Sequence, residues 1–281
     1  MKLLRHGPLG HERVAMLDAE GRLRDLSEHL PDLSGAAVGP ETLDRLRGLD
    51  PAELREITDP QRIGACLSRV PNFHCVGLNY ARHAAEAGKP PPSEPILFSK
   101  ASSALSGPND AVVIPRGSEQ TDWEVELGVV IGRETYEVSE ARALEHVAGY
   151  CVVNDVSERH FQAERGGQWI KGKSSPGFGP IGPWLVTADE VPDPQALRLS
   201  LALNGEVVQD DSTADMIFSV AEIISYMSRF MRLLPGDIIA TGTPSGVGMG
   251  MSPQRFLRPG DLMELEVEGL GRQRQEAVAA K

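Results

Sequence analysis

Three carboxylates in this 281-residue chain have the spacing of ligands for a metal ion. Glu124 and Glu126 begin an apolar run that continues to Ile131, and Asp155 closes a second apolar run that starts at Gly149. Alternation along a strand puts Glu124 and Glu126 on one face, where Asp155 can meet them from the end of a neighbouring strand. The sequence therefore predicts a cluster of three oxygen ligands, which suits Mg²⁺ or Mn²⁺ better than zinc.

The alternative for a Glu-x-Glu pattern is the solvated face of a half-buried strand. The surroundings argue against it, because Val125, Leu127 and residues 129–131 are apolar and Trp123 comes immediately before them. Like charges on one face also repel, so a strand that keeps both is better explained by a cation between them.

A second candidate site lies between Asn79 and Gly88, where the sequence predicts about two helical turns with Asn79 as N-cap and Gly88 as the stop. His83 and Glu86 are three apart and share a face of this helix. A carboxylate beside an imidazole raises its basicity and fixes its tautomer, as a water-activating base requires. The alternative is an ordinary surface ion pair. The prolines at 90–92 predict an exposed segment that could close over a site.

Three weaker signals surround these two. Lys171 and Lys173 lie in a loop rich in Gly and Pro, where an ammonium beside a metal would neutralise a developing oxyanion. Arg159 and Gln162 face the same way on a short helix after Asp155 and could hold a substrate carboxylate. The segment 241–248 lacks the lysine of a phosphate-binding loop, but its turn could present N–H groups and Thr hydroxyls to an anion.

Two regions differ in composition. Residues 1–70 mix short apolar runs with charged, Leu-rich segments and predict a small α+β lobe, whereas residues 71–281 alternate short β-rich runs with Gly and Pro. The second region predicts a mostly β, sandwich-like or barrel-like domain. The strands are expected at 73–77, 96–98, 111–114, 125–131, 149–153, 184–187, 197–203, 238–240 and 262–267.

One clear helix interrupts the β-rich region. Ser219 and Glu222 form a capping box, and Pro235 with Gly236 stops the helix. Its apolar stripe is predicted to pack in the core and consists of Ile223, Ile224, Met227, Phe230, Met231 and Leu234.

Composition narrows the possible partners and the compartment. The formal net charge is −12 with no basic block, which disfavours nucleic acid and anionic membrane surfaces as partners. No segment resembles a signal peptide or a membrane span, so a cytoplasmic protein is expected. Cys66, Cys75 and Cys151 are odd in number and lie in apolar contexts, which predicts reduced, buried thiols.

Taken together, the motifs from about Phe73 to the C-terminus resemble the fumarylacetoacetate hydrolase family. The motifs are Gly-Leu-Asn-Tyr with His83 and Glu86, Phe-Ser-Lys at 98–100 with Gly107-Pro108, Asp-Trp-Glu-Val-Glu at 122–126, Asn-Asp-Val-Ser-Glu-Arg at 154–159 with Gln162, Gly-Lys-Ser at 172–174, Asp-Met-Ile-Phe at 215–218, and Thr-Gly-Thr-Pro-Ser-Gly-Val-Gly at 241–248. The resemblance implies a mixed β-sandwich roll with a small N-terminal lobe, in a homodimer.

The resemblance also implies a role for each matching residue. Glu124, Glu126 and Asp155 match the Mg²⁺ or Mn²⁺ ligands. His83 and Glu86 match the dyad that activates water, and Lys173, preferred to Lys171, matches the lysine beside the metal. The positions that line the substrate pocket are Tyr80, Arg159, Gln162 and Thr243.

The implied reaction is hydrolysis of a C–C bond in a 2,4-dioxo acid, an acylpyruvate or a 2,4-diketo-3-deoxy sugar acid, to pyruvate and a second acid. Alternatives on the same scaffold are an oxaloacetate decarboxylase and a hydroxymuconate-type isomerase, and a further one is a metal-binding module without catalysis. Many members carry Phe-Asp-Thr-Phe after the lysine where this chain has Ser-Pro-Gly-Phe at 175–178. The pocket near the metal, and with it the substrate, can therefore differ.

Overall fold

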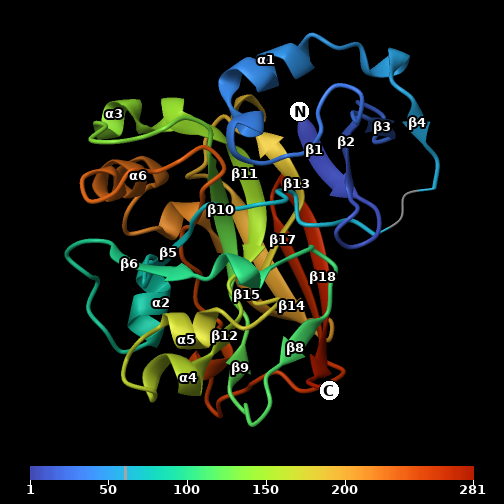
Figure 1. Cartoon of the computed structure of the whole chain (residues 1–281). Coiled ribbons are helices and arrows are strands. Elements are labelled where there is room, and N and C mark those ends of the chain that lie inside the picture. Colours follow the sequence, from blue (N-terminus) through green and yellow to red (C-terminus); the bar gives the residue numbers. More distant parts are fainter. Residues whose placement is uncertain (60–61) are drawn as a thin grey trace.

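A long mixed sheet forms the centre of the molecule. The structure, a computed structural model, describes residues 1–59 and 62–281, and in this part of the chain the large sheet has eleven strands (Figure 1). Ten of them follow one another in the order β4 (Glu56–Ile57), β3 (Leu23–Asp25), β2 (Arg13–Leu17), β1 (Lys2–His6), β13 (Gly179–Thr187), β11 (Val147–Asn154), β10 (Val125–Ile131), β16 (Ile238–Ala240), β5 (Phe73–Gly77) and β6 (Ile96–Lys100). The eleventh, β7 (Leu105–Ser106), pairs with β13.

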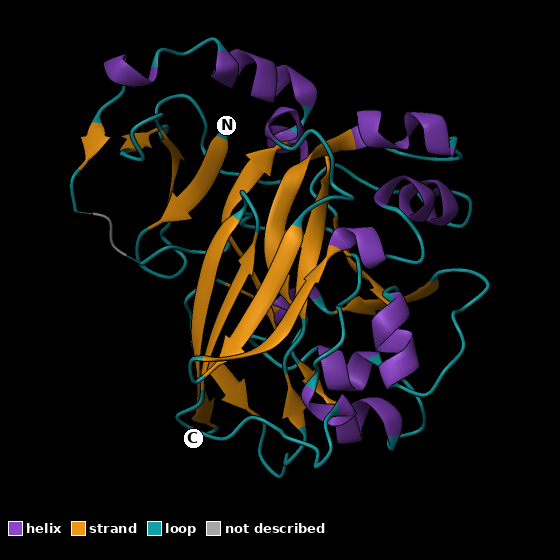
Figure 2. Cartoon of the chain, turned by 180° about the vertical axis from the view of Figure 1, so that it is seen from behind, coloured by secondary structure: helices purple, strands orange, loops and turns teal. Residues whose placement is uncertain are grey.

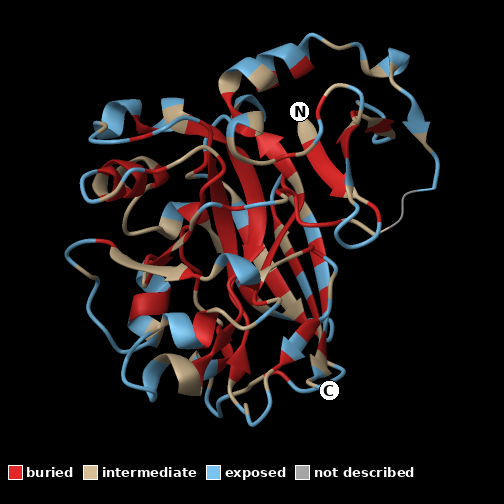
Figure 3. Cartoon of the chain, in the orientation of Figure 1, coloured by how far each residue is buried: buried red, intermediate tan, exposed pale blue. Residues whose placement is uncertain are grey.

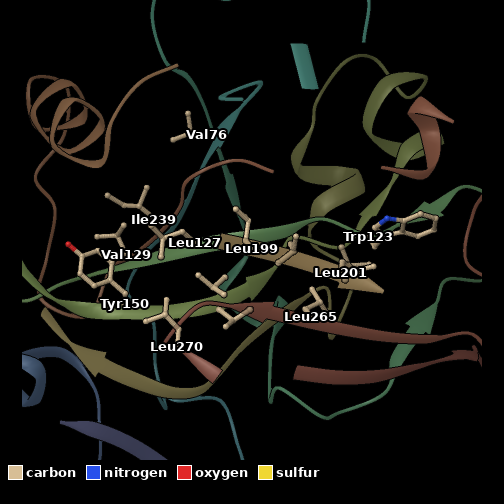
Figure 4. Packing of buried hydrophobic residues seen from close by; sticks show 14 of the residues in the cluster. Val76, Trp123, Leu127, Val129, Tyr150, Leu199, Leu201, Ile239, Leu265 and Leu270 are labelled. Carbon is tan, nitrogen blue, oxygen red and sulfur yellow. The ribbon is translucent and has the colours of Figure 1, made fainter. Parts of the chain in front are cut away.

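A smaller sheet packs on this one and closes a β-sandwich (Figure 2). Its strands are β15 (Glu206–Ser212), β14 (Arg198–Leu203), β17 (Leu262–Val267), β18 (Gly271–Ala279) and β8 (Val112–Ile114). Leu199, Leu201 and Leu265 of this sheet join Leu127 and Val129 of β10 in one buried cluster (Figure 4). The fold is thus mostly β, a mixed β-sandwich roll, as the sequence predicted.

The strongest apolar runs became the most buried strands. Every residue of β10 and β11 is buried (Figure 3), and the two strands are antiparallel with Val125 opposite Asn154. This register brings the start of β10 beside the end of β11. The residues that flank these two strand ends, Glu124 and Asp155, therefore lie next to each other.

The N-terminal lobe extends the large sheet. Strands β1 to β4 follow one another at its edge, and Lys2 of β1 pairs with Val186 of β13. Figures 1 and 2 show this lobe, with α1 (Pro40–Arg47), beyond one end of the sandwich. The predicted boundary near residue 70 falls shortly before β5, in chain that connects the lobe to the rest of the sheet.

The other helices lie on one flank of the sandwich (Figures 1 and 2). They are α2 (Ala81–Glu86), α3 (Glu140–Ala143), α4 (Arg159–Ala163), α5 (Ile170–Lys173) and α6 (Val220–Ser228). Among them, α4 contacts α5, and both contact the short strand β12 (Ser157–Glu158), which pairs with β9 (Thr121–Asp122). None of the helices in the described ranges is long and apolar enough to cross a membrane.

The predicted helix at 219–234 is only partly correct. Its capping box is present, with the Ser219 hydroxyl accepting from the Glu222 N–H and the Glu222 carboxylate accepting from the Ser219 N–H. The helix nevertheless ends at Ser228, and Phe230 is 64 % exposed instead of packing in the core. Phe230 lies in the turn after the helix, where the period of 3.6 residues no longer sets the direction of a side chain.

Candidate functional site

Three buried carboxylates converge where β10 begins and β11 ends. Glu124 precedes β10, Glu126 is its second residue, and Asp155 follows β11, with the Asp155 N–H donating to the Glu124 carbonyl at 2.9 Å. One oxygen from each carboxylate lies within 4.8 Å of the others, and the three residues are 5, 2 and 0 % exposed. The sequence thus predicted this cluster and the strand ends that form it. A set of three carboxylates can hold a hard divalent cation.

Two lysines contact this cluster from inside the protein. The Lys173 ammonium lies 2.7 Å from Glu124 Oε2 and 2.7 Å from Asp155 Oδ2. The Lys100 ammonium lies 2.5 Å from Asp155 Oδ1, and it also donates to the carbonyls of Val156 at 3.0 Å and of Lys173 at 2.6 Å. Lys100 therefore holds the end of β11 and the end of α5 at a fixed separation. Burial disfavours the charged form of Lys173, but Asp155 and Glu124 outweigh it and raise the lysine pKa.

Arg159 of α4 supplies a third cation. Its Nε donates to Asp122 Oδ2 at 2.8 Å, and its Nη1 lies 2.7 Å from Glu124 Oε1 and donates to Gln162 Oε1 at 3.2 Å. Burial alone would raise the pKa of Glu124, but Lys173 and then Arg159 lower it to about 2. Glu124 is therefore ionised at neutral pH and bound to two cations.

Glu126 differs from its neighbours because no described Lys, Arg or His pairs with it. Its Oε2 accepts the Gly242 N–H at 2.8 Å, and burial together with the charges of Asp155 and Glu124 raises its pKa. A buried carboxylate beside two others is costly unless a cation compensates it. The donor set therefore fits a divalent cation, which would neutralise Glu126 and reach Glu124 and Asp155 as well.

The imidazole and carboxylate of α2 meet as predicted from their spacing. His83 Nδ1 lies 3.0 Å from Glu86 Oε2, and Glu86 Oε1 accepts the Gly246 N–H at 2.9 Å. Gly250 makes room for this carboxylate, since a Cβ at Gly250 would lie 2.4 Å from Glu86 Cδ.

The segment 241–248 donates backbone N–H groups to three carboxylates. The donor to Glu126 is Gly242, the donor to Glu86 is Gly246, and the Gly248 N–H donates to Asp122 at 2.7 Å. The sequence left open that this turn presents N–H groups and Thr hydroxyls to an anion. Its N–H groups do meet anions, which are the protein's own carboxylates, whereas the hydroxyls of Thr241 and Thr243 donate to backbone carbonyls.

A pocket of about 350 Å³ opens over these groups. Its lining includes eight of the predicted site residues, namely His83, Glu86, Glu124, Glu126, Arg159, Gln162, Lys173 and Thr243. Asp155 lies beneath them, fully buried. Phe98 and Trp169 form an aromatic wall with ring centroids 5.2 Å apart, and a Cβ at Gly77 would lie 2.6 Å from the Trp169 ring.

Three residues that the sequence singled out, Asn79, Tyr80 and Thr243, are buried in the structure. Asn79 does not cap α2: its side chain donates to the carbonyls of Phe218 and Thr241 and ties this loop to its neighbours. Tyr80 is fully buried and lies outside the pocket lining. The Thr243 hydroxyl donates to the Val125 carbonyl at 2.9 Å.

Of the two lysines in the predicted loop, Lys173 reaches the cluster from the short helix α5. Lys171 is exposed and donates to the Arg165 carbonyl at 2.7 Å. The preference for Lys173 thus agrees with its placement. The roles of all these residues in binding and catalysis stay predictions.

Two residues of the site were not assigned a role from the sequence. Lys100 lies two residues after the apolar run at 96–98, where a lysine that continues the strand can be buried and must then find a partner, and this context is the signal that could have found it. Asp122 stands in the same segment as Glu124 and anchors Arg159, yet nothing in its spacing separates it from a surface aspartate. Lys100 and Asp122 pair with residues that lie far away in the sequence, so only the structure shows these contacts.

The comparisons with known proteins agree on one family. The family model described as fumarylacetoacetate hydrolase, C-terminal, matches residues 72–278. A Burkholderia multivorans protein, provisionally named a hydrolase, is 58 % identical over 282 residues, with all of both chains covered.

Solved structures match the whole chain as well. Fumarylacetoacetate hydrolase from Exiguobacterium antarcticum is 36 % identical with a TM-score of 0.87, and all of both chains is covered. Maleylpyruvate hydrolase from Sphingobium, solved with manganese and pyruvate, is 26 % identical with a TM-score of 0.81, again over all of both chains. Structures named as 2-hydroxyhepta-2,4-diene-1,7-dioate isomerases from mycobacteria match too.

Proposed function

The chain belongs to the fumarylacetoacetate hydrolase family, and from this premise we propose that it is a divalent-metal-dependent hydrolase of C–C bonds. The substrate is a 2,4-dioxo acid of the acylpyruvate or 2,4-diketo-3-deoxy sugar acid type, and the products are pyruvate and a second acid. The observation that carries the proposal is that Glu124, Glu126 and the His83–Glu86 pair line one pocket, with Asp155 of the triad buried beneath it. A site for a cation and a site for a general base thus face the same space.

The cofactor in this proposal is Mg²⁺ or Mn²⁺, held by Glu124, Glu126 and Asp155. Support comes from the all-oxygen donor set and from Glu126, which is buried beside two carboxylates and pairs with no Lys, Arg or His of the described residues. The Sphingobium maleylpyruvate hydrolase structure contains manganese and pyruvate. When bound, the metal would act as a Lewis acid toward the oxygens of a 2-oxo acid.

The residues of the chain supply the proton transfer. His83 accepts a proton from water at the ring nitrogen Nε2, because Nδ1 faces Glu86. Glu86 is held in turn by the Gly246 N–H, so it fixes the tautomer and the orientation of the ring. The activated water attacks the distal carbonyl, the C–C bond breaks, and its electron pair passes to the pyruvate enolate. The proton that His83 took from water is then returned, and the enolate becomes pyruvate.

Lys173 stabilises the negative charge that develops on the enolate. Its raised pKa keeps the ammonium protonated at neutral pH, and it lies between two of the triad carboxylates at the base of the pocket. A fixed ammonium in a site shielded from water stabilises an enolate oxygen more than a solvated ammonium does. Lys173 is therefore the residue of this chain that we expect to contact the developing negative charge.

The test is pyruvate release from a panel of acylpyruvates, oxaloacetate and a diketo-deoxy sugar acid, with and without Mg²⁺ or Mn²⁺. Metal-dependent pyruvate from the dioxo acids, lost in Glu124→Ala and His83→Ala, supports the proposal. Pyruvate from oxaloacetate alone, with activity kept in His83→Ala, contradicts it and favours a decarboxylase.

A second candidate function is isomerisation of a hydroxymuconate-type acid, favoured by the match to isomerase structures. It is detected as a change in the ultraviolet absorbance of such an acid without release of pyruvate. Bound metal without turnover of any of these compounds would indicate a binding module.

We also propose that the protein is a cytoplasmic homodimer. Light scattering after size-exclusion chromatography measures its oligomeric state.

A further inference from the structure

One buried carboxylate contacts both halves of the site without lining the pocket. Asp122 is fully buried, and both of its oxygens are used inside the protein. Its Oδ1 accepts the N–H groups of Trp123 at 2.9 Å and Gly248 at 2.7 Å. Its Oδ2 accepts the Met249 N–H at 3.1 Å and the Arg159 Nε–H at 2.8 Å, and Arg159 Nη2 lies 2.7 Å away. Asp122 therefore joins a pocket-lining loop to a pocket-lining arginine.

Through Oδ2, Asp122 sets the direction of the Arg159 guanidinium. Burial disfavours the charged form of Arg159, but Asp122 and then Glu124 outweigh burial and raise the pKa of the arginine. With Nε and Nη2 directed at Asp122, the planar guanidinium has its Nη1 edge left, which lies 2.7 Å from Glu124 Oε1 and donates to Gln162 Oε1 at 3.2 Å. Asp122 thus fixes, through Arg159, the contact that the carboxylate cluster receives from α4.

Asp122 also holds the segment 246–250, which supports the general base. The Gly246 N–H donates to Glu86 Oε1 at 2.9 Å, and a Cβ at Gly250 would lie 2.4 Å from Glu86 Cδ, so this segment packs directly on Glu86. The position of Glu86, and with it that of the imidazole that Glu86 orients, therefore depends on where this segment is held.

We propose that Asp122 is a positioning residue, which fixes the separation between the general base and the carboxylate cluster by holding the 246–250 segment and Arg159 at one point. Asp122 ends the short strand β9, two residues before Glu124, so the chain itself connects this point to the cluster. The inference rests on the proposed function, in which the base and the cluster act on one substrate. A misplacement of about 1 Å between such groups lowers the rate by about 10²-fold.

Asp122→Asn tests the inference, because an amide has a single acceptor oxygen. In one orientation of the amide the Gly248 N–H loses its acceptor, and in the other orientation the Met249 N–H and Arg159 lose theirs. The 246–250 segment therefore loses a hydrogen bond to Asp122 in either orientation.

The matched control is Asp237→Asn. Asp237 is also fully buried, and it accepts the backbone N–H groups of Asn72 at 2.8 Å and Leu234 at 2.7 Å. Neither Asp237 nor these two partners line the pocket. The control therefore measures the effect of the same chemical change in a buried aspartate that has no connection to the site.

Amide hydrogen exchange in metal-free protein measures the coupling without turnover. Asp122→Asn should raise the exchange rate in the 246–250 segment and in α2 by about ten-fold, since a hydrogen bond to a charged group is lost. Asp237→Asn should leave the exchange of both segments at the wild-type rate. Unchanged exchange of α2 in Asp122→Asn would overturn the inference, whatever the activity.

Turnover gives the second measurement. In saturating Mn²⁺ and 2,4-dioxo acid, kcat of Asp122→Asn should lie about 10²-fold below that of the wild type, whereas Asp237→Asn should match the wild type. The double variant with Glu86→Gln should lose no more than Glu86→Gln alone, because both changes act through one imidazole. Losses that multiply would overturn the inference. An Mn²⁺ dissociation constant weakened as much as kcat would do so too, since Asp122 would then act on the metal ligands.

A second pair of variants removes one hydrogen bond and leaves Asp122 in place. Met249 lies in the 3₁₀ turn Gly248–Gly250, whose backbone angles proline accepts. Met249→Pro deletes the N–H that Asp122 accepts and Met249→Ala keeps it, so the proline variant should have the lower kcat, by about three-fold or more, and the faster exchange of α2. Equal values in the two variants would overturn the inference. If the wild type releases no pyruvate from any dioxo acid, the proposed function is wrong, and the exchange rates alone decide the coupling.

Discussion

Replacing Lys100 with methionine should destabilise the protein more than almost any other single change at a lysine. The Lys100 side chain is fully buried, 2.5 Å from Asp155 Oδ1, and donates to two backbone carbonyls. Removing one partner of a buried ion pair costs about 3–5 kcal/mol, because the other charge stays buried. Asp155 keeps Lys173 as a partner, so we expect a loss of about 3 kcal/mol.

The assay is urea unfolding followed by circular dichroism, in EDTA, so that metal binding does not add to stability. Lys171→Met is the matched control, since its side chain is exposed, and its free energy of unfolding should stay within about 0.5 kcal/mol of the wild type. A loss below about 1 kcal/mol in Lys100→Met would refute the reasoning. It would mean that Asp155 is compensated by Lys173 alone.

Three further substitutions test other contacts of the site and the fold. Gly250→Ala places a Cβ against the Glu86 carboxylate and should displace it from His83. Because His83 then loses its orienting partner, kcat of pyruvate release should fall by about 10²-fold or more. An unchanged kcat would contradict this prediction. Glu126→Gln removes a charge that repels the other two carboxylates, so in EDTA the variant should unfold at a higher temperature than the wild type. The variant should gain no stability from Mn²⁺, because it lacks one of the proposed ligands. A shift of its unfolding temperature by Mn²⁺ as large as that of the wild type would contradict this prediction. Ser219→Ala removes the cap of α6 and should cost about 1 kcal/mol in urea unfolding, and no measurable loss would show that packing alone holds the helix.

The strand pattern was predictable where burial and apolar composition coincide. Residues 125–131 and 238–240 were predicted as strands and form β10 and β16 with those bounds. Strands β15 and β18 were not predicted, because they are polar in composition. Their buried glutamines are stabilised by contacts from far along the chain: Gln275 donates to the Pro108 carbonyl at 2.6 Å, and Gln209 accepts the Val125 N–H at 3.0 Å.

The site was predictable to the extent that its residues follow a local spacing. Strand alternation and the helical step of three found Glu126 and the His83–Glu86 pair. Lys100 and Asp122 act through partners 55 and 37 residues away in the chain, and no period connects such residues. Their roles depend on where β6 and β9 lie beside the cluster, which is set by the packing of the whole sandwich.

The most direct test of the account is a titration of Mn²⁺ into EDTA-stripped protein, with pyruvate release from a 2,4-dioxo acid measured at each step. If the carboxylate site holds the catalytic metal, no pyruvate is released without metal and the rate saturates as the site fills, with no such rise in Glu126→Gln. Pyruvate release at full rate from the stripped protein would contradict it, and so would silence at saturating Mn²⁺.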